Sequence, residues 1–293
     1  DLTEFVMPSE VTTVGINTFN GSDSLKTVKV PESITVDSFS NIRLSVTTAD
    51  LIVPATAKKL IVENGVVYGK DDSGNKTSIV YVDKTFNETA FEVPATVNLI
   101  GANAFKNITL LKTITFAKSA DEVQLTIDKG AFSGSGLTAI ELPKRLVSLG
   151  DTVFQNCKSL ASVKFEDGYD CKTITSSMFA GCTALTEITI PGNVVSIERS
   201  AFSGCNNLTT VTFGLTSTGR PSNIDAIGAD VFSKCSKLVN VRYEMKNVET
   251  DEVVYENNAL PESLTVLGAS DSYHSGPFNN CTSLVKMRLQ TRQ

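Results

Sequence analysis

The chain has 293 residues, with 26 basic and 32 acidic side chains, so its formal net charge is −6 and its pI is about 5.0. Hydrophobic residues make up 41% of the sequence, which excludes a disordered chain and is enough for a large core. The acidic balance argues against nucleic-acid binding, and no segment has the ~18 consecutive apolar residues of a membrane span. The single histidine, His274, lies in a polar segment that lacks the separately positioned nucleophile and acid of a hydrolase.

A short motif recurs along the chain. In each copy a phenylalanine stands in a turn-like context, as in residues 201–205, and a leucine follows about six residues later. Apolar residues three and five positions after the leucine alternate with polar ones, which predicts strands such as 187–190 and 210–213 with one buried face. A second apolar run, as at 194–197, predicts a second short strand, and the phenylalanine segment predicts a tight or 3₁₀ corner. The phenylalanines of the motif are Phe19, Phe105, Phe132, Phe154, Phe179, Phe202, Phe232 and Phe278.

The spacing of the motif predicts a stacked architecture. From Phe105 onward the steps between phenylalanines are 27, 22, 25, 23, 30 and 46 residues. One unit cannot bury both sides of its apolar residues, so the units must stack as coils with neighbouring strands ~4.8 Å apart. We therefore expect residues 1–293 to form one solenoid, mostly of short β-strands, with about 11 to 12 coils of ~23 residues. Because both ends of the sequence fall inside repeats, we expect a fragment of a longer protein.

Three segments depart from the regular motif. Residues 39–60 keep only a degraded form of it. Within residues 62–83, two alternating apolar runs flank a polar turn and predict an inserted β-hairpin. Residues 244–276 form an irregular insertion before the motif resumes at Phe278.

The residues from Leu185 to Cys205 read Leu-Thr-x-Ile-x-Ile-Pro-x-x-Val-x-x-Ile-x-x-x-Ala-Phe-x-x-Cys. This pattern resembles the BspA-like leucine-rich repeats of bacterial surface and secreted proteins, and the resemblance covers nearly the whole chain. It implies a right-handed leucine-rich-repeat solenoid, a location outside the cell or on its surface, and a role in adhesion or ligand binding. The hairpin within residues 62–83 also resembles an insertion that these proteins often carry.

Five of the six cysteines occupy one position of the motif, three residues after the phenylalanine. Such a row predicts a ladder of buried thiols, since equivalent side chains on stacked coils run parallel and do not converge as a disulfide requires. The alternatives are a disulfide or a metal site, and no Cys-x-x-Cys pair supports zinc. Cys171 lies outside the row, and a bridge to Cys157 or Cys182 is the one disulfide that the spacing allows.

The outward positions of the regular strands are the expected ligand surface. Basic residues gather towards the C-terminal end of these rows and point to an acidic protein or a sulfated glycan as partner; the alternative is a solvated basic face. The candidate residues are Lys164, Arg242, Lys286 and Arg288. No aromatic residue lies in the outward rows, which argues against stacking on sugars.

The favoured function is a non-catalytic binding or adhesion module for a surface or matrix protein or a glycan, without cofactor, metal or nucleic acid. The alternative is a structural spacer or a self-associating surface protein, because open strand edges invite stacking. An enzyme is not expected, since the sequence offers no sufficient set of catalytic residues.

Overall fold

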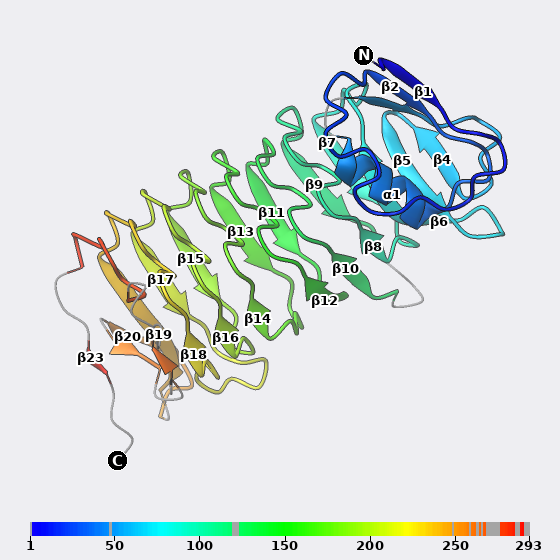
Figure 1. Ribbon diagram of the computed structural model, residues 1–293. Coiled ribbons are helices and arrows are strands. Elements are labelled where there is room, and N and C mark those ends of the chain that lie inside the picture. The colour runs from blue at the N-terminus through cyan, green and yellow to red at the C-terminus, as the bar shows by residue number, and fades with distance from the viewer. Residues whose placement is uncertain are drawn as a thin grey trace.

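The computed structural model describes residues 2–46, 49–118, 123–247, 249–257, 259–261, 264, 266–267, 276–284 and 288–289. It is an elongated β-solenoid of about nine coils of ~23 residues (Figure 1). The expected fold class is therefore confirmed. The coils are fewer than the 11 to 12 expected, because a helix and two antiparallel segments take up chain that the repeat count assigned to coils.

The regular coils place their strands in two rows of parallel pairs. Alternation of side chains buries one face of each strand, and residues such as Ile188, Val211 and Val241 pair in register across three coils. The outer side of the first row is called the strand face below. The first row contains β7 (Ala90–Val93), β9 (Thr113–Phe116), β11 (Ala139–Leu142), β13 (Ser162–Phe165), β15 (Glu187–Ile190), β17 (Thr210–Phe213) and β19 (Asn240–Lys246). The second row contains β6 (Lys76–Val82), β8 (Leu99–Ile100), β10 (Leu125–Ile127), β12 (Leu146–Leu149), β14 (Thr173–Ile174), β16 (Ser196–Ile197), β18 (Ala226–Ile227) and β22 (Val266–Leu267).

The phenylalanine corners are tight turns, and their rings form a continuous stack inside the solenoid. Neighbouring centroids from Phe105 to Phe278 lie 5.1 to 5.5 Å apart, with interplanar angles of 8° to 18°. The turns are also tied by backbone bonds between coils; the N–H of Phe179, for example, donates to the carbonyl of Ala201 at 2.8 Å. The stack therefore follows from placing one aromatic residue at one position of every coil.

The cysteine row is the expected ladder of buried thiols. All six cysteines are free and buried, including Cys171. Each thiol of the row donates to the carbonyl of a phenylalanine in the preceding coil, as Cys182 does to Phe154 and Cys205 to Phe179, both at 3.2 Å. The thiols thus point at backbone, and the disulfide alternatives are excluded in this structure.

The N-terminal coils contain a helix that the sequence pattern did not predict. The parallel strands β1 (Glu4–Val6), β2 (Thr27–Lys29) and β3 (Asp50–Ile52) form one small sheet, and α1 (Val36–Ser45) lies between β2 and β3 in the chain. The hydroxyl of Thr35 accepts from the N–H of Ser38 and caps the first turn of α1. Phe39 and Ile42 on this helix are fully buried, so the helix takes over the core contacts of a corner.

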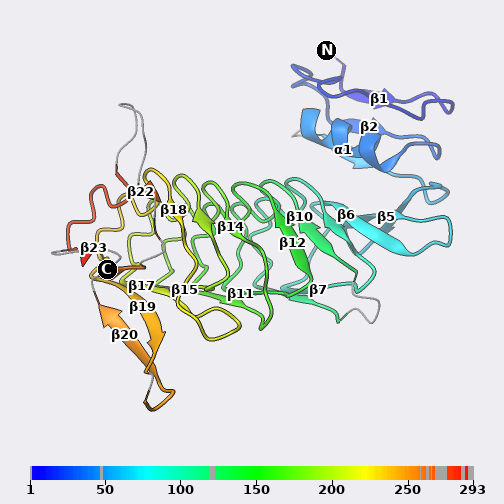
Figure 2. The same ribbon diagram turned by 90° about the horizontal axis from the view of Figure 1, so that it is seen from below.

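The hairpin expected within residues 62–83 is a three-stranded antiparallel unit made of β4 (Leu60–Glu63), β5 (Val66–Lys70) and β6. Strands β5 and β6 of this unit are buried on both faces, whereas in β4 only Leu60 is buried. Val66 and Ile79 pack in the core of the later coils, whereas Val67 and Val80 pack in the core of the first ones. Figure 2 shows β1, β2 and α1 on one side of this unit and the later coils on the other.

The insertion expected to be irregular begins as an ordered hairpin. Strand β19 continues past the four residues of its neighbours and pairs antiparallel with β20 (Val253–Asn257). Figure 2 shows this hairpin projecting from the body of the solenoid. Most of residues 258–276, including His274, lie outside the described residues. Within this range β21 (Ala259–Leu260) is described, and it pairs parallel with β23 (Arg288–Leu289).

Candidate functional site

A groove of about 740 Å³ lies over the strand face between β11 and β19. Its floor consists of outward side chains of these strands. One wall consists of the loops that leave the ends of the strands, at residues 166–169, 191–193 and 214–217. The groove therefore runs across several coils.

The loops of the groove are held by a contact between successive coils. The carboxylate of Glu166, at the end of β13, accepts from the N–H of Lys144 at 2.9 Å. Glu244 occupies the same repeat position on β19 and accepts from the N–H of Leu215 at 3.1 Å. At Gly192 the coils approach so closely that an added Cβ would lie 2.2 Å from the carbonyl carbon of Leu215. The wall of the groove is thus fixed by contacts with the backbone of the neighbouring coils.

Two of the four candidate residues, Lys164 and Arg242, line this one groove. Lys286 lies outside the described residues, and so does the side chain of Arg288, so a basic cluster around Arg242 stays a prediction. Carboxylates outnumber the two cations among the lining residues. The acidic lining residues are Glu141, Glu166, Asp167, Glu187 and Glu244.

Arg242 is oriented by contacts from both sides. Its Nε donates to the hydroxyl of Thr212 at 3.1 Å, and its guanidinium carbon lies 4.2 Å from the centroid of the Tyr255 ring. A cation over an aromatic face is attracted by the ring quadrupole. The planar guanidinium is thereby held against the β19–β20 hairpin.

Tyr255 is a surface residue that the repeat analysis missed, because it lies in the insertion and not in the outward rows. The signal was the short run of strand-forming residues Val253-Val254-Tyr255 after the turn-forming residues 247–251. That pattern predicts a strand returning antiparallel to β19. Its pairing places an aromatic ring on the strand face, contrary to the expectation from the outward rows.

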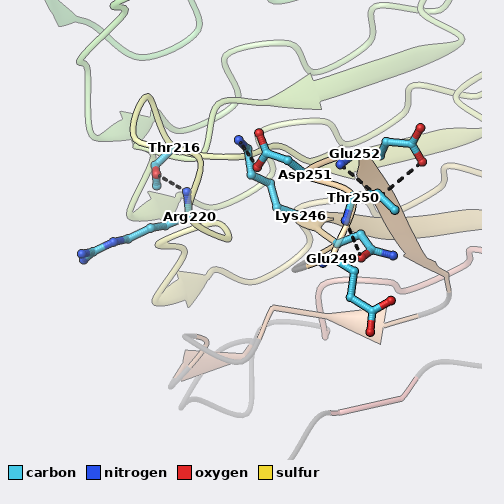
Figure 3. A network of polar contacts seen from close by, with 8 residues as sticks. Thr216, Arg220, Lys246, Glu249, Thr250, Asp251 and Glu252 are labelled. Atoms are coloured by element: carbon cyan, nitrogen blue, oxygen red, sulfur yellow. Dashed lines mark hydrogen bonds and ion pairs between the residues drawn. The ribbon is translucent and has the colours of Figure 1, made fainter.

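The hairpin is closed by a network of polar contacts at its tip (Figure 3). Lys246 pairs with Asp251 at 2.8 Å, and the N–H groups of Glu249 and Thr250 donate to the side chain of Asn247. The neighbouring loop, in which the N–H of Arg220 donates to the hydroxyl of Thr216, lies beside the hairpin in Figure 3. These contacts hold β20, and with it Tyr255, in place.

Two buried groups beside the groove are structural. The phenol of Tyr169 is 2% exposed, and burial raises the pKa of Tyr169 and of the adjacent Cys171 thiol. Arg145 lies in a second groove of about 770 Å³, where its guanidinium donates to the carbonyls of Val97 and Val123 at 2.9 and 3.2 Å. Burial lowers the pKa of Arg145. The guanidinium of Arg145 therefore binds backbone of other coils, and the ring of Tyr169 packs edge-on against Phe165 with a centroid distance of 4.8 Å.

Among the described residues, no group of three or more histidine, cysteine, aspartate or glutamate side chains is arranged to bind a metal ion. In the same part of the chain, no helix has the length and apolar character that crossing a membrane requires.

The sequence matches the model of the BspA type leucine-rich repeat region over residues 1–54, 81–209 and 212–292, with six copies. No curated protein matches it. The solved structure of a leucine-rich repeat protein from Eubacterium ventriosum is 26% identical, with a TM-score of 0.70, over 98% of this chain and 67% of the other. A leucine-rich cell surface protein from Faecalibacterium prausnitzii is 18% identical, with a TM-score of 0.48, over 100% of this chain and 61% of the other. The phenylalanine stack, the parallel rows of strands and the family match agree: the chain belongs to the BspA-type leucine-rich-repeat family.

Proposed function

We propose that this chain is a non-catalytic ligand-binding module of a bacterial surface or secreted protein, and that it binds a protein or glycan through the groove on its strand face. The observation that carries the proposal is the groove itself. It is the place where outward side chains from five neighbouring strands and the loops between them line one hollow. Membership in a leucine-rich-repeat family, which serves protein binding, supports a binding role.

The composition of the groove supports contact with a polar ligand. The floor presents hydroxyls, among them Ser162 and Thr189, together with the cations Lys164 and Arg242 and several carboxylates. Hydroxyl groups both donate and accept hydrogen bonds, so such a floor suits the polar surface of a protein or a glycan. The location outside the cell is proposed from the family resemblance.

The proposal is tested by binding of the purified chain to an array of host matrix proteins and glycans at low and moderate salt. Lys164→Ser combined with Arg242→Ser should lower binding of the ligand, because both side chains lie in the groove. A matched control combines Lys106→Ser with Lys234→Ser, two exposed lysines beside the phenylalanine corners. A blank array, or equal loss in the control, would contradict the proposal and favour a structural spacer.

A further inference from the structure

The β19–β20 hairpin extends the strand face beyond the last regular coil. Residues that pair directly across an antiparallel ladder point to the same side of the sheet. Arg242 pairs with Asn257, Glu244 with Tyr255 and Lys246 with Val253, so all six side chains share the side that faces the groove. The hairpin thus adds a short polar and aromatic surface at the end of the groove.

Tyr255 is the centre of this surface. Its side chain is 45% exposed, although it stands on a strand held by the tip network. One face of the ring carries the Arg242 guanidinium at 4.2 Å. The opposite face is electron-rich and attracts polarised C–H groups, whereas a second cation there would be repelled by Arg242.

Donors and acceptors flank the ring. Within the described part of the chain, Arg242 uses only its Nε in a hydrogen bond, so the two terminal nitrogens have no partner there. Glu244 uses Oε2 to accept from Leu215, and no bond to its Oε1 is found among the described residues. The amide of Asn257 stands opposite Arg242. Together they offer charged donors, a charged acceptor and an amide next to one aromatic face.

We propose that this surface is a subsite for a neutral hexose unit of a glycan, which stacks its C–H face on Tyr255 and places its hydroxyls on Arg242 and Glu244. A sugar hydroxyl both donates and accepts, so vicinal hydroxyls match a guanidinium and a carboxylate that lie side by side. An acidic sugar is disfavoured, because carboxylates outnumber cations by five to two among the residues that line the groove. The inference rests on the proposed binding function and specifies the ligand class at the C-terminal end of the groove.

The position of the subsite also fits a chain of sugars. Arg242 and Glu244 line the groove, so a glycan bound at Tyr255 continues over β17 and β15, where the exposed Thr189 supplies a hydroxyl. Three strand steps of ~4.8 Å give a path of about 14 Å, which accommodates two to three further hexose units. The groove and the subsite thus form one continuous surface.

The test is a printed array of neutral hexose oligosaccharides (cellotetraose, maltotetraose and galactotetraose) beside sulfated and uronic-acid oligosaccharides. Calorimetric titration then follows with the tightest neutral binder. Tyr255→Ala should weaken binding by about tenfold or more, since it removes the stacked ring. Tyr255→Phe keeps the ring and should bind within about twofold of the native chain. The control is Val195→Ala, an exposed apolar residue (38% exposed) beside the other row of strands.

Three results would overturn the subsite: no neutral oligosaccharide binds, only sulfated or uronic oligosaccharides bind, or Tyr255→Ala binds as the native chain does. Circular dichroism of each variant shows whether the fold is kept. The failure of the subsite can be distinguished from the failure of the proposed function. Loss of a protein or sulfated-glycan ligand in the Lys164 and Arg242 double variant, with full binding in Tyr255→Ala, would keep the groove as a binding site and remove the neutral-sugar subsite.

Discussion

Phe179 gives the sharpest test of how the solenoid is held together. Its ring is fully buried in the middle of the stack, with the centroids of Phe154 and Phe202 at 5.5 and 5.3 Å. Phe179→Ala removes the ring from a place whose walls are fixed by backbone bonds to the neighbouring coils, so the cavity cannot collapse. The expected loss in free energy of unfolding is about 3–5 kcal/mol.

A second substitution separates stacking from burial. Phe179→Leu keeps most of the buried apolar volume and loses two ring contacts, which are worth ~0.5–1.5 kcal/mol each, so it should cost about 1–3 kcal/mol. Phe278 is a matched position, because its ring is half-buried and has one stacked neighbour among the described residues, Phe232 at 5.4 Å. We expect Phe278→Ala to cost about half as much as Phe179→Ala, since less apolar surface is lost.

Urea denaturation followed by far-UV circular dichroism measures these differences, because the chain has no tryptophan to report on unfolding. A substitution in a central coil also weakens the coupling between the coils on either side, so Phe179→Ala should broaden the transition. The reasoning is refuted if Phe179→Ala costs less than about 1.5 kcal/mol, or no more than Phe278→Ala, since the stack would then add nothing to stability.

Four further outcomes are expected. The six buried thiols should resist a thiol reagent in the native protein and react fully in denaturant. Because burial raises the pKa of Cys205 from 9.0 to about 12, the native state should lose stability as pH rises through this range and be unaffected below about 9; flat stability in alkaline denaturation curves would refute this. Arg145→Met should cost about 2 kcal/mol in thermal or urea unfolding, because buried carbonyls lose charged donors, whereas Lys106→Met should be neutral. Gly192→Ala should cost about 1–3 kcal/mol through its clash with Leu215, while at Gly276 no described atom lies within 4 Å of an added Cβ and Gly276→Ala should change little.

The repeat predicted the core well because one position in the motif meets the same neighbours in every coil. The phenylalanine, leucine and cysteine positions each became a row, so spacing alone identified which residues are buried. The helix α1 could not be predicted from the repeat spacing. Phe39 stands in Ser38-Phe39-Ser40-Asn41, which is close to a corner, and Thr35 caps the helix that forms there. Thr175 stands at the same distance before Phe179, where a turn forms, so a capping residue alone does not distinguish the helix from a corner.

The candidate site was predicted only in part, for a related reason. Outward positions could be assigned within the motif, and two of the residues assigned to them, Lys164 and Arg242, line one groove. The loops and the hairpin have no repeat position, so the carboxylates Glu166 and Asp167 at the rim and the ring of Tyr255 were not assigned to that surface. The net charge of the groove depends on these residues. The outward positions alone therefore did not give the full set of groups that a ligand would meet.

The way in which β19 becomes a hairpin explains why this insertion matters to the strand face. An insertion in a corner leaves the outward rows unchanged, because corner residues have no place in the ladder. Here a repeat strand continues for three residues beyond its neighbours, from Glu244 to Lys246, and keeps their alternation. The returning strand inherits that alternation through pairing, so the orientation of Tyr255 is set by the solenoid itself. A chain can therefore add one oriented aromatic ring to its binding face without altering any buried position of the repeat.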